Sequence, residues 1–293
     1  MLKLSVFQDQ YTQKMFKNKE KRLLEVGYNK LLKENKLDYL IKLSNRLAKI
    51  EFNIQTNFLD VDKENLRNCL KQFLIQRRLY TVFNYRILLA LGRKRNVLKM
   101  GLPNKFLIYL EENENIKSNT FLNKVRWKIF VFYWYLIGNY FILSFFLRGI
   151  KLLFINHNES EYIYFDNLSS KSLPKKNSNT VIDWYIKKET RERGIDITHN
   201  VLVAKKTILD GIKIYPLSIP FKNKIKITFL IKYLFSAIIF SLKSFLKIFT
   251  DEFTNPLILK EFPLLYFCKK AKKHQLAKKY FFHNSTSIFR PLW

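Results

Sequence analysis

The chain has 293 residues, which is enough for one large domain or two modest ones. A hydrophobic share of 48% excludes a disordered chain, and the presence of only 7 Gly and 7 Pro favours long helices over many short strands. The formal net charge of +30 predicts attraction to phosphate in nucleic acid, anionic lipid or a nucleotide sugar. Most of this charge is Lys, which reads phosphate and bases less specifically than Arg, and A/T-rich codons are an alternative source of it.

The cysteines and histidines are too widely spaced to form a structural site. Cys69 and Cys268 form no CxxC pair, and no two His residues are spaced as ligands on one helix. We therefore expect neither a disulfide framework nor a bound metal. The N-terminal residues lack an apolar core of signal-peptide length, which favours a reducing, cytoplasmic setting.

Residues 1–84 are predicted to form a helix-rich region, because apolar residues recur there at helical spacing among Lys and Glu, most clearly over residues 1–50. No acidic residue lies in the stretch 65–110, which indicates either a solvated basic face or a surface for phosphate or anionic lipid. Gly101 and Pro103 then mark a turn between a predicted strand and a predicted helix.

The most apolar run of the chain extends from Ile129 to Leu147 and holds 19 residues without a charge. That length is within the range of a membrane-spanning helix. Lys and Arg flank the run on both sides, so the positive-inside rule gives no orientation, and Asn139 lies at its middle. The run is predicted to be a helix that spans a membrane, lies in its interface or is buried in the protein.

Residues 151–226 differ in character. Short apolar pieces alternate there with polar turns and are predicted to be strands of an α/β domain: LLFINH, YIYFDNL, VIDWYIK, NVLVA and IKIYPLSIPF.

A second apolar helix is predicted at residues 227–249. One narrow face of it carries polar residues, namely Lys232, Ser236, Lys243 and Lys247. This pattern is typical of a helix in a membrane interface, and a mostly buried helix with a thin wet edge is the alternative. Two membrane spans are disfavoured, because the loop 150–226 would then carry 14 Lys or Arg to the outer side.

Five pieces of the chain together resemble one family: GLPNKF, EYIYFDNLSSKSLP, VIDWYIKK, THNV and YFFHNSTSIFRPLW. They look like the bacterial polysaccharide-biosynthesis proteins named for a PFTS motif, and the closing piece is the most specific. The resemblance covers residues 85–293. Phosphate-loop, dinucleotide-binding, HExxH and GxSxG motifs are absent from the sequence.

The resemblance implies an α/β fold with two parts. A helix-rich N-terminal region, residues 1–84, is followed by an incomplete Rossmann-like domain of the glycosyltransferase B type, residues 85–293, with apolar helices at 129–147 and 227–249. In the family the chain continues past Arg-Pro-Leu-Trp into a second domain. We therefore expect an N-terminal portion here, and whether it is an active enzyme stays open.

The same resemblance implies surface polysaccharide biosynthesis, of capsular or lipopolysaccharide type, by a glycosyltransferase-like protein at the cytoplasmic face of the inner membrane. The implied partners are an anionic membrane surface, a nucleotide sugar as donor and a lipid-linked or polysaccharide acceptor. No cofactor is expected beyond that donor, since basic groups and helix N-termini can hold its diphosphate without a metal.

The candidate residues for an interdomain cleft or a phosphate site are His199, His283, Asn284, Ser285 and Arg290. Under the resemblance the last four lie near the cleft, where Arg290 pairs a phosphate and His283 acts as a base or donor near neutral pH. The alternative is structural: Asn284 and Ser285 cap a helix, and Arg290 satisfies backbone carbonyls. His199 follows a predicted strand, where the sites of α/β folds gather, or else is a structural histidine.

Two functions from other classes compete with this hypothesis. A basic nucleic-acid-binding protein would use Lys contacts to phosphate and base stacking on Phe and Tyr. It has no need of apolar runs of roughly 20 residues, so nucleic acid is the weaker partner. A non-catalytic integral membrane protein would need no sheet at residues 160–220.

Overall fold

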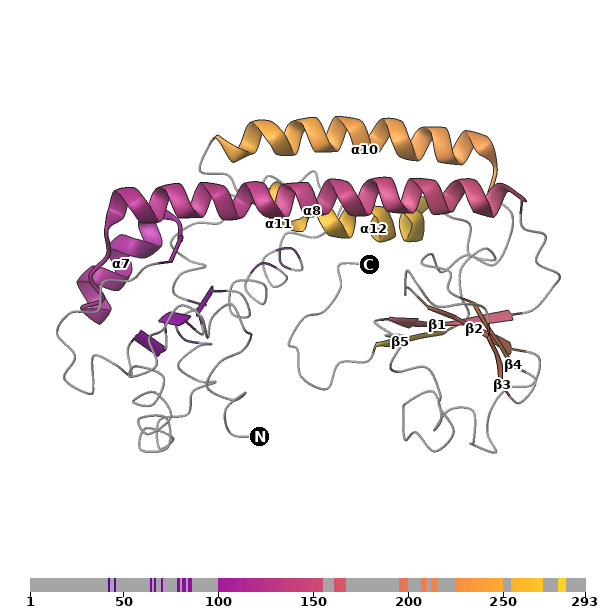
Figure 1. Ribbon diagram of the computed structural model, residues 1–293, viewed down its shortest axis with the longest axis horizontal. Helices are drawn as coiled ribbons and strands as arrows, with labels where there is room; N and C mark the ends of the chain where they lie inside the picture. Colours follow the sequence, from indigo (N-terminus) through magenta and orange to yellow (C-terminus); the bar gives the residue numbers. More distant parts are fainter. Residues whose placement is uncertain are drawn as a thin grey trace. The chain divides into compact units, whose positions relative to one another are not determined.

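The computed structural model describes the chain in separate stretches (Figure 1). The described residues are 42, 45, 64, 66, 70, 78, 79, 81, 82, 84, 85, 100–154, 161–166, 195–199, 207–209, 212–215, 225–249, 254–270 and 279–282. Most of the helix-rich region predicted at residues 1–84, and the strand predicted before Gly101, lie outside the described residues.

Helix α7, Asn104–Glu114, follows the Gly-Leu-Pro turn. Pro103 precedes it, and the carbonyl of Pro103 accepts hydrogen bonds from the N–H groups of Phe106 at 2.9 Å and Leu107 at 3.1 Å. Asn115 ends the helix in the left-handed conformation, with a φ of 52°. The helix predicted after this turn is confirmed.

Two long apolar helices follow in the chain. Helix α8, Thr120–Phe154, has 35 residues, and Asn119 caps its start, because its Oδ1 accepts a hydrogen bond from the N–H of Leu122 at 3.0 Å. Helix α10, Ile227–Ile248, has 22 residues. Both apolar segments predicted to be helical lie in α8 and α10, so these predictions are confirmed.

Short elements make up the rest of the described chain. The helical pieces after α10 are α11 Thr254–Ile258, the 3-10 helix η2 Leu259–Glu261 and α12 Phe262–Lys270. The strands are β1 Glu161–Asp166, β2 Ile195–His199, β3 Thr207–Leu209, β4 Ile212–Tyr215 and β5 Lys279–Phe282. They form a sheet in the order β3-β4-β2-β1-β5, in which β3 and β4 are antiparallel and the other neighbours are parallel.

The chain divides into two compact units, and each contains part of α8 and part of α10. Unit 1 comprises Met1–Leu136, Lys243–Leu259 and Ile288–Leu292, and unit 2 comprises Ile137–Leu242, Lys260–Ser287 and Trp293.

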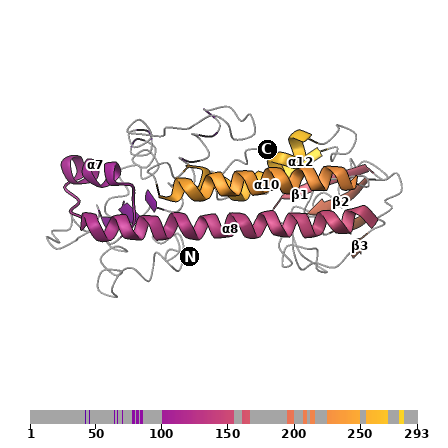
Figure 2. The ribbon, with the colours of Figure 1, turned by 90° about the horizontal axis from the view of Figure 1, so that it is seen from above.

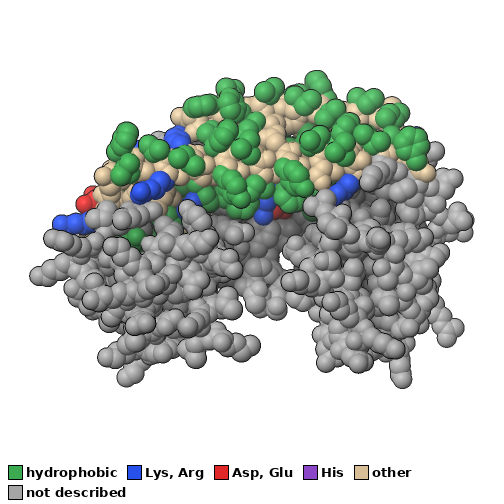
Figure 3. All heavy atoms as spheres, in the orientation of Figure 1, with side chains coloured by type: hydrophobic (Ala, Val, Ile, Leu, Met, Phe, Trp, Pro, Cys, Tyr) green, Lys and Arg blue, Asp and Glu red, His purple; other side chains and the backbone are tan. Residues whose placement is uncertain are grey.

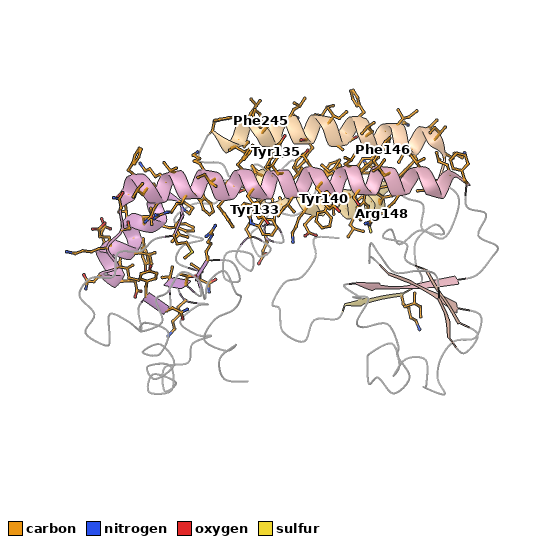
Figure 4. All side chains as sticks on the ribbon, viewed as in Figure 1. Tyr133, Tyr135, Tyr140, Phe146, Arg148 and Phe245 are labelled. Atoms are coloured by element: carbon orange, nitrogen blue, oxygen red, sulfur yellow. The ribbon has the colours of Figure 1, made fainter. Side chains whose placement is uncertain are left out.

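In unit 1, the end of α10 packs antiparallel against the first half of α8. The Nζ of Lys128 donates a hydrogen bond to the carbonyl of Ile248 at 2.9 Å. Further along α8, the ring of Tyr135 lies 5.7 Å from the ring of Phe245 between the two helices (Figure 4). The residue number rises on α8 as it falls on α10, which is the antiparallel arrangement.

The Gly-Leu-Pro turn packs directly on the backbone of α8, also in unit 1. Leu102 is fully buried, and a Cβ atom at Gly101 would lie only 2.3 Å from the backbone nitrogen of Trp127. No side chain fits at that distance, so the turn requires glycine at this position.

In unit 2, the first part of α10 packs antiparallel against the second half of α8 (Figure 2). The hydroxyl of Ser241 donates a hydrogen bond to Oδ1 of Asn139 at 2.6 Å, and the hydroxyl of Tyr233 donates one to the carbonyl of Ile142 at 3.0 Å. The side chains of Asn139, Tyr233 and Ser241 thus each find a hydrogen-bond partner on the neighbouring helix.

Helix α12 covers a further side of α10 in unit 2, through a cluster of aromatic rings. The ring of Tyr233, which is fully buried, has its centroid 6.0 Å from that of Phe262, 5.4 Å from that of Tyr266 and 5.1 Å from that of Phe267. Aromatic pairs at these separations contribute beyond the area that they bury.

The predicted incomplete Rossmann-like domain of the glycosyltransferase B type is wrong. The described part of the chain is mainly helical and shows no Rossmann-like α/β domain. Such a domain alternates parallel strands with crossover helices, whereas the described residues contain no helix between β1 and β4. The apolar piece beginning at Leu152, predicted to be a strand, is the end of α8, because periodicity alone does not separate a short strand from a helix end. The domain boundary between residues 84 and 85 stays a prediction.

We predict that Gly101→Ala destabilises the protein, because its Cβ would collide with backbone atoms of α8 that cannot move aside. The expected loss in the free energy of unfolding is about 1–3 kcal/mol, the usual cost of overpacking. Denaturant unfolding of the purified protein measures it.

Gly149→Ala is the matched control for this substitution. Its Cβ would lie 2.5 Å from Cδ1 of Leu230, the far end of a flexible side chain, and alanine is favoured over glycine inside a helix by about 0.5–1 kcal/mol. Equal stability of Gly101→Ala and the wild type would contradict the close packing of the turn.

Candidate membrane-binding surface

One side of α8 is exposed and apolar along most of its length. The exposed residues recur at intervals of three or four, which places them on one side of the helix. This α8 stripe consists of Leu122, Val125, Ile129, Phe132, Leu136, Tyr140, Leu143 and Leu147, each between 42% and 62% exposed. Figure 3 shows hydrophobic side chains gathered over α8 and α10 on the visible face.

Helix α10 carries a second exposed apolar face. The α10 face consists of Ile231, Phe235, Ile238, Leu242 and Leu246, each between 50% and 67% exposed. Lys232 and Lys243 are also exposed, and each directly follows a member of the face in the chain. Because successive residues of a helix are about 100° apart, both lysines lie at the edge of the α10 face.

The opposite sides of the two helices are buried in protein. The buried residues include Trp127, Val131, Trp134, Ile142 and Phe145 on α8 and Leu230, Tyr233, Ala237, Phe240 and Ser244 on α10. Each helix therefore has one protein-facing side and one exposed apolar side. A core helix of a soluble protein would bury its most apolar side, whereas here much of that side is exposed.

The charges of the two helices are all of one sign. Neither α8 nor α10 contains Asp or Glu. Their cations are Lys124, Arg126, Lys128, Arg148, Lys151, Lys232, Lys243 and Lys247. Such an excess of positive charge is complementary to anionic headgroups, which attract Lys and Arg near a membrane.

Both helices are also long and apolar enough to cross a membrane, by length and composition alone. The qualifying segments are Thr120–Ile150, with 31 residues, and Ile227–Ile248, with 22. A core helix of a soluble protein meets the same criterion, so this finding alone is weak support for membrane association.

The candidate cleft residues are not brought together by the described structure. His199 is the last residue of β2, as expected for a residue at a strand end. His283, Asn284, Ser285 and Arg290 lie outside the described residues. Their assignment to a phosphate site or a cleft therefore stays a prediction.

Within the described stretches, no group of three or more His, Cys, Asp or Glu residues could hold a metal ion. No family model, no curated protein and no solved structure matches the chain.

The exposed α8 stripe is the feature that sequence reasoning missed. The uncharged run from Ile129 to Leu147 marked an apolar helix but not which side of it would be covered. Lys124 and Arg126, taken as flanks, lie inside α8, which begins at Thr120. The alternation of exposed and buried residues every three to four positions depends on the partners α10 and α12, which lie far away in the chain.

The thiol of Cys268 in α12 lies outside the two long helices, and burial raises its pKa to about 12. Since the thiolate is the reactive form, Cys268 stays protonated and inert at neutral and mildly alkaline pH. We predict that, in a Cys69→Ser background, iodoacetamide at pH 8 alkylates Cys268 far more slowly in the folded protein than after unfolding. The expected difference is at least about 100-fold, because each unit of pKa changes the thiolate fraction tenfold. Mass spectrometry over time measures both rates, and equal rates would contradict the burial of this thiol.

Proposed function

We propose that this protein binds a lipid bilayer through the α8 stripe and the α10 face. The observation that carries the proposal is the exposure of two apolar helix faces on elements without any acidic residue. Monomeric soluble proteins rarely expose contiguous apolar patches larger than a few hundred Å² (roughly 300–600 Å² at most) unless the patch meets a partner.

The energetics favour a bilayer as that partner. Transfer of one large apolar side chain from water into hydrocarbon contributes about 1.5–3 kcal/mol when it is fully buried. The α8 stripe and the α10 face together offer many such side chains, already half exposed and held on rigid helices. The cations beside them supply the electrostatic attraction that interfacial helices use with anionic lipids.

A surface-polysaccharide role at the cytoplasmic face of the inner membrane remains a proposal that rests on the resemblance. Membrane binding is compatible with it, because lipid-linked acceptors lie in the bilayer. Deletion of the coding sequence is expected to lower the amount of surface polysaccharide, measured by gel staining of the extracted material, and the full-length coding sequence is expected to restore it. An unchanged amount would remove this role and leave membrane binding untouched.

We predict that the double substitution Phe235→Asp and Leu242→Asp weakens vesicle binding at least tenfold. Two charged groups in place of large apolar side chains would have to enter the bilayer, at a cost of several kcal/mol (roughly 2.5–3.5 each at full depth). Flotation of the purified protein with vesicles of phosphatidylglycerol and phosphatidylcholine measures the bound fraction.

The control is Ile108→Asp, which places a carboxylate at another exposed apolar residue, 45% exposed, on α7. It is expected to bind vesicles as the wild type does. Equal binding by the double variant and the wild type would exclude the α10 face as the lipid contact.

A further inference from the structure

The chain after α10 folds back along α10 within unit 2. The ring of Phe240 lies 5.3 Å from that of Phe262, and further back along α10 the ring of Phe229 lies 5.3 Å from that of Phe267. The residue number rises on α12 as it falls on α10, so the two helices are antiparallel. The end of α12 therefore lies beside the start of α10.

Two further contacts agree with this fold-back of α12, one with α8 and one within the sheet. The ring of Phe267 also lies 6.2 Å from that of Phe145 in the second half of α8. Beyond α12, strand β5 pairs with β1 in parallel register, with Phe165 opposite Phe281. Since β1 precedes α10 and β5 follows it, the chain must lie on the same side of a membrane before and after the segment from α10 to α12.

A chain that crosses a membrane once in α10 must cross back before β5. The return would have to use the segment from α11 to α12, Thr254–Lys270. Lys260 and Glu261 interrupt it, with Nζ and Oε1 3.4 Å apart, and Glu261 is only 7% exposed. The uncharged part of α12, Phe262–Cys268, has a length of about 10 Å at 1.5 Å per residue, far below the ~30 Å of the hydrocarbon core.

The return segment is moreover covered by protein. Leu257, Leu259, Phe262, Leu265 and Phe267 are each at most 1% exposed. A helix that crossed a bilayer at the rim of a protein would present apolar side chains to lipid, as the α10 face does and α12 does not. Hence α12 occupies the protein side of α10, and of these two helices only α10 has an apolar face that lipid can reach.

We infer that α8 and α10 lie in the plane of the membrane, with the α8 stripe and the α10 face inserted into one leaflet, and that neither helix crosses the bilayer. The inference rests on the proposed membrane binding and adds its geometry. α8 shares this orientation because it packs along α10 in both units, from the contact of Lys128 with Ile248 to that of Gly149 with Leu230. Lys232 and Lys243, at the edge of the α10 face, then lie at the level of the anionic headgroups, as cations of an in-plane helix do.

The starts of α8 and α10 distinguish in-plane helices from spanning helices. Because the two helices are antiparallel, spanning would place Lys124 and Lys226 on opposite sides of the membrane, whereas in-plane helices leave both on one side. Two variants that each add one cysteine to a Cys69→Ser background, Lys124→Cys and Lys226→Cys, are labelled with a membrane-impermeant maleimide in right-side-out and inside-out membrane vesicles. The background protein, which retains the inert Cys268, is the control for unspecific labelling.

Labelling of both positions from the same side is the expected result. Labelling from opposite sides would overturn the in-plane arrangement while leaving membrane binding intact. Absence of the protein from the washed membrane fraction would instead overturn the proposed function, and with it this inference.

Insertion depth gives an independent measurement. An environment-sensitive fluorophore is attached to cysteine variants of Val125, Leu136 and Leu147 on the α8 stripe, and its quenching by brominated lipids of known bromine depth is measured. In-plane helices give equal depths at the three positions. Spanning helices would place Leu136 about 16 Å deeper than either end, from 1.5 Å per residue, and that result would overturn the inference.

Discussion

The packing of α10 along α8 is the contact on which the rest of the described structure depends. α12 is held through its rings on α10, and the Gly-Leu-Pro turn with α7 is held on the backbone of α8. At one end of the pair, the ammonium group of Lys128 also binds the last carbonyl of α10, at Ile248, where the helix dipole favours a cation. Separation of the two helices would therefore divide the described structure, with the turn and α7 left on α8 and the Tyr233 ring contacts of α12 left on α10.

A hydrogen bond between the two helices accounts for a polar residue in the middle of their apolar contact. Asn139 lies in the middle of an uncharged run, and its Oδ1 accepts a hydrogen bond from the hydroxyl of Ser241. An unsatisfied amide there would cost about 1–3 kcal/mol, whereas the satisfied pair stabilises the packing by about 0.5–1.5 kcal/mol. Asn139 thus favours this one register of α10 against α8, since a shift by one turn would leave its Oδ1 without Ser241.

The sequence predicted the elements whose cause is local. An uncharged run of 19 residues is enough to identify the helix around Asn139, and Pro103 is enough to start α7. The fold-back of α12 could not be predicted, because it depends on rings such as Tyr233 and Phe267 that are distant in the chain and carry no periodic pattern of their own. The requirement for Gly101 arises in the same way from a segment of α8 more than twenty residues away.

The strand prediction at Leu152 was wrong because three apolar residues fit a strand and a helix end equally well. Of the candidate cleft residues, only His199 lies in the described part of the chain, at the end of β2.

The charges on α8 and α10 support the proposed membrane binding independently of the exposure of their apolar side chains. A solvated helix commonly alternates acidic and basic residues, because ion pairs at i, i+4 stabilise it by about 0.2–0.5 kcal/mol each. Neither α8 nor α10 has an acidic residue to pair with its lysines, so this support is absent from both. In the proposed membrane binding, an anionic lipid surface would replace the missing acids and contribute about 1 kcal/mol for each Lys or Arg close to it. Insertion of apolar side chains would then give the larger share of the binding free energy, while Lys232 and Lys243 would limit how deep the α10 face can enter, because their ammonium groups would stay at the headgroups.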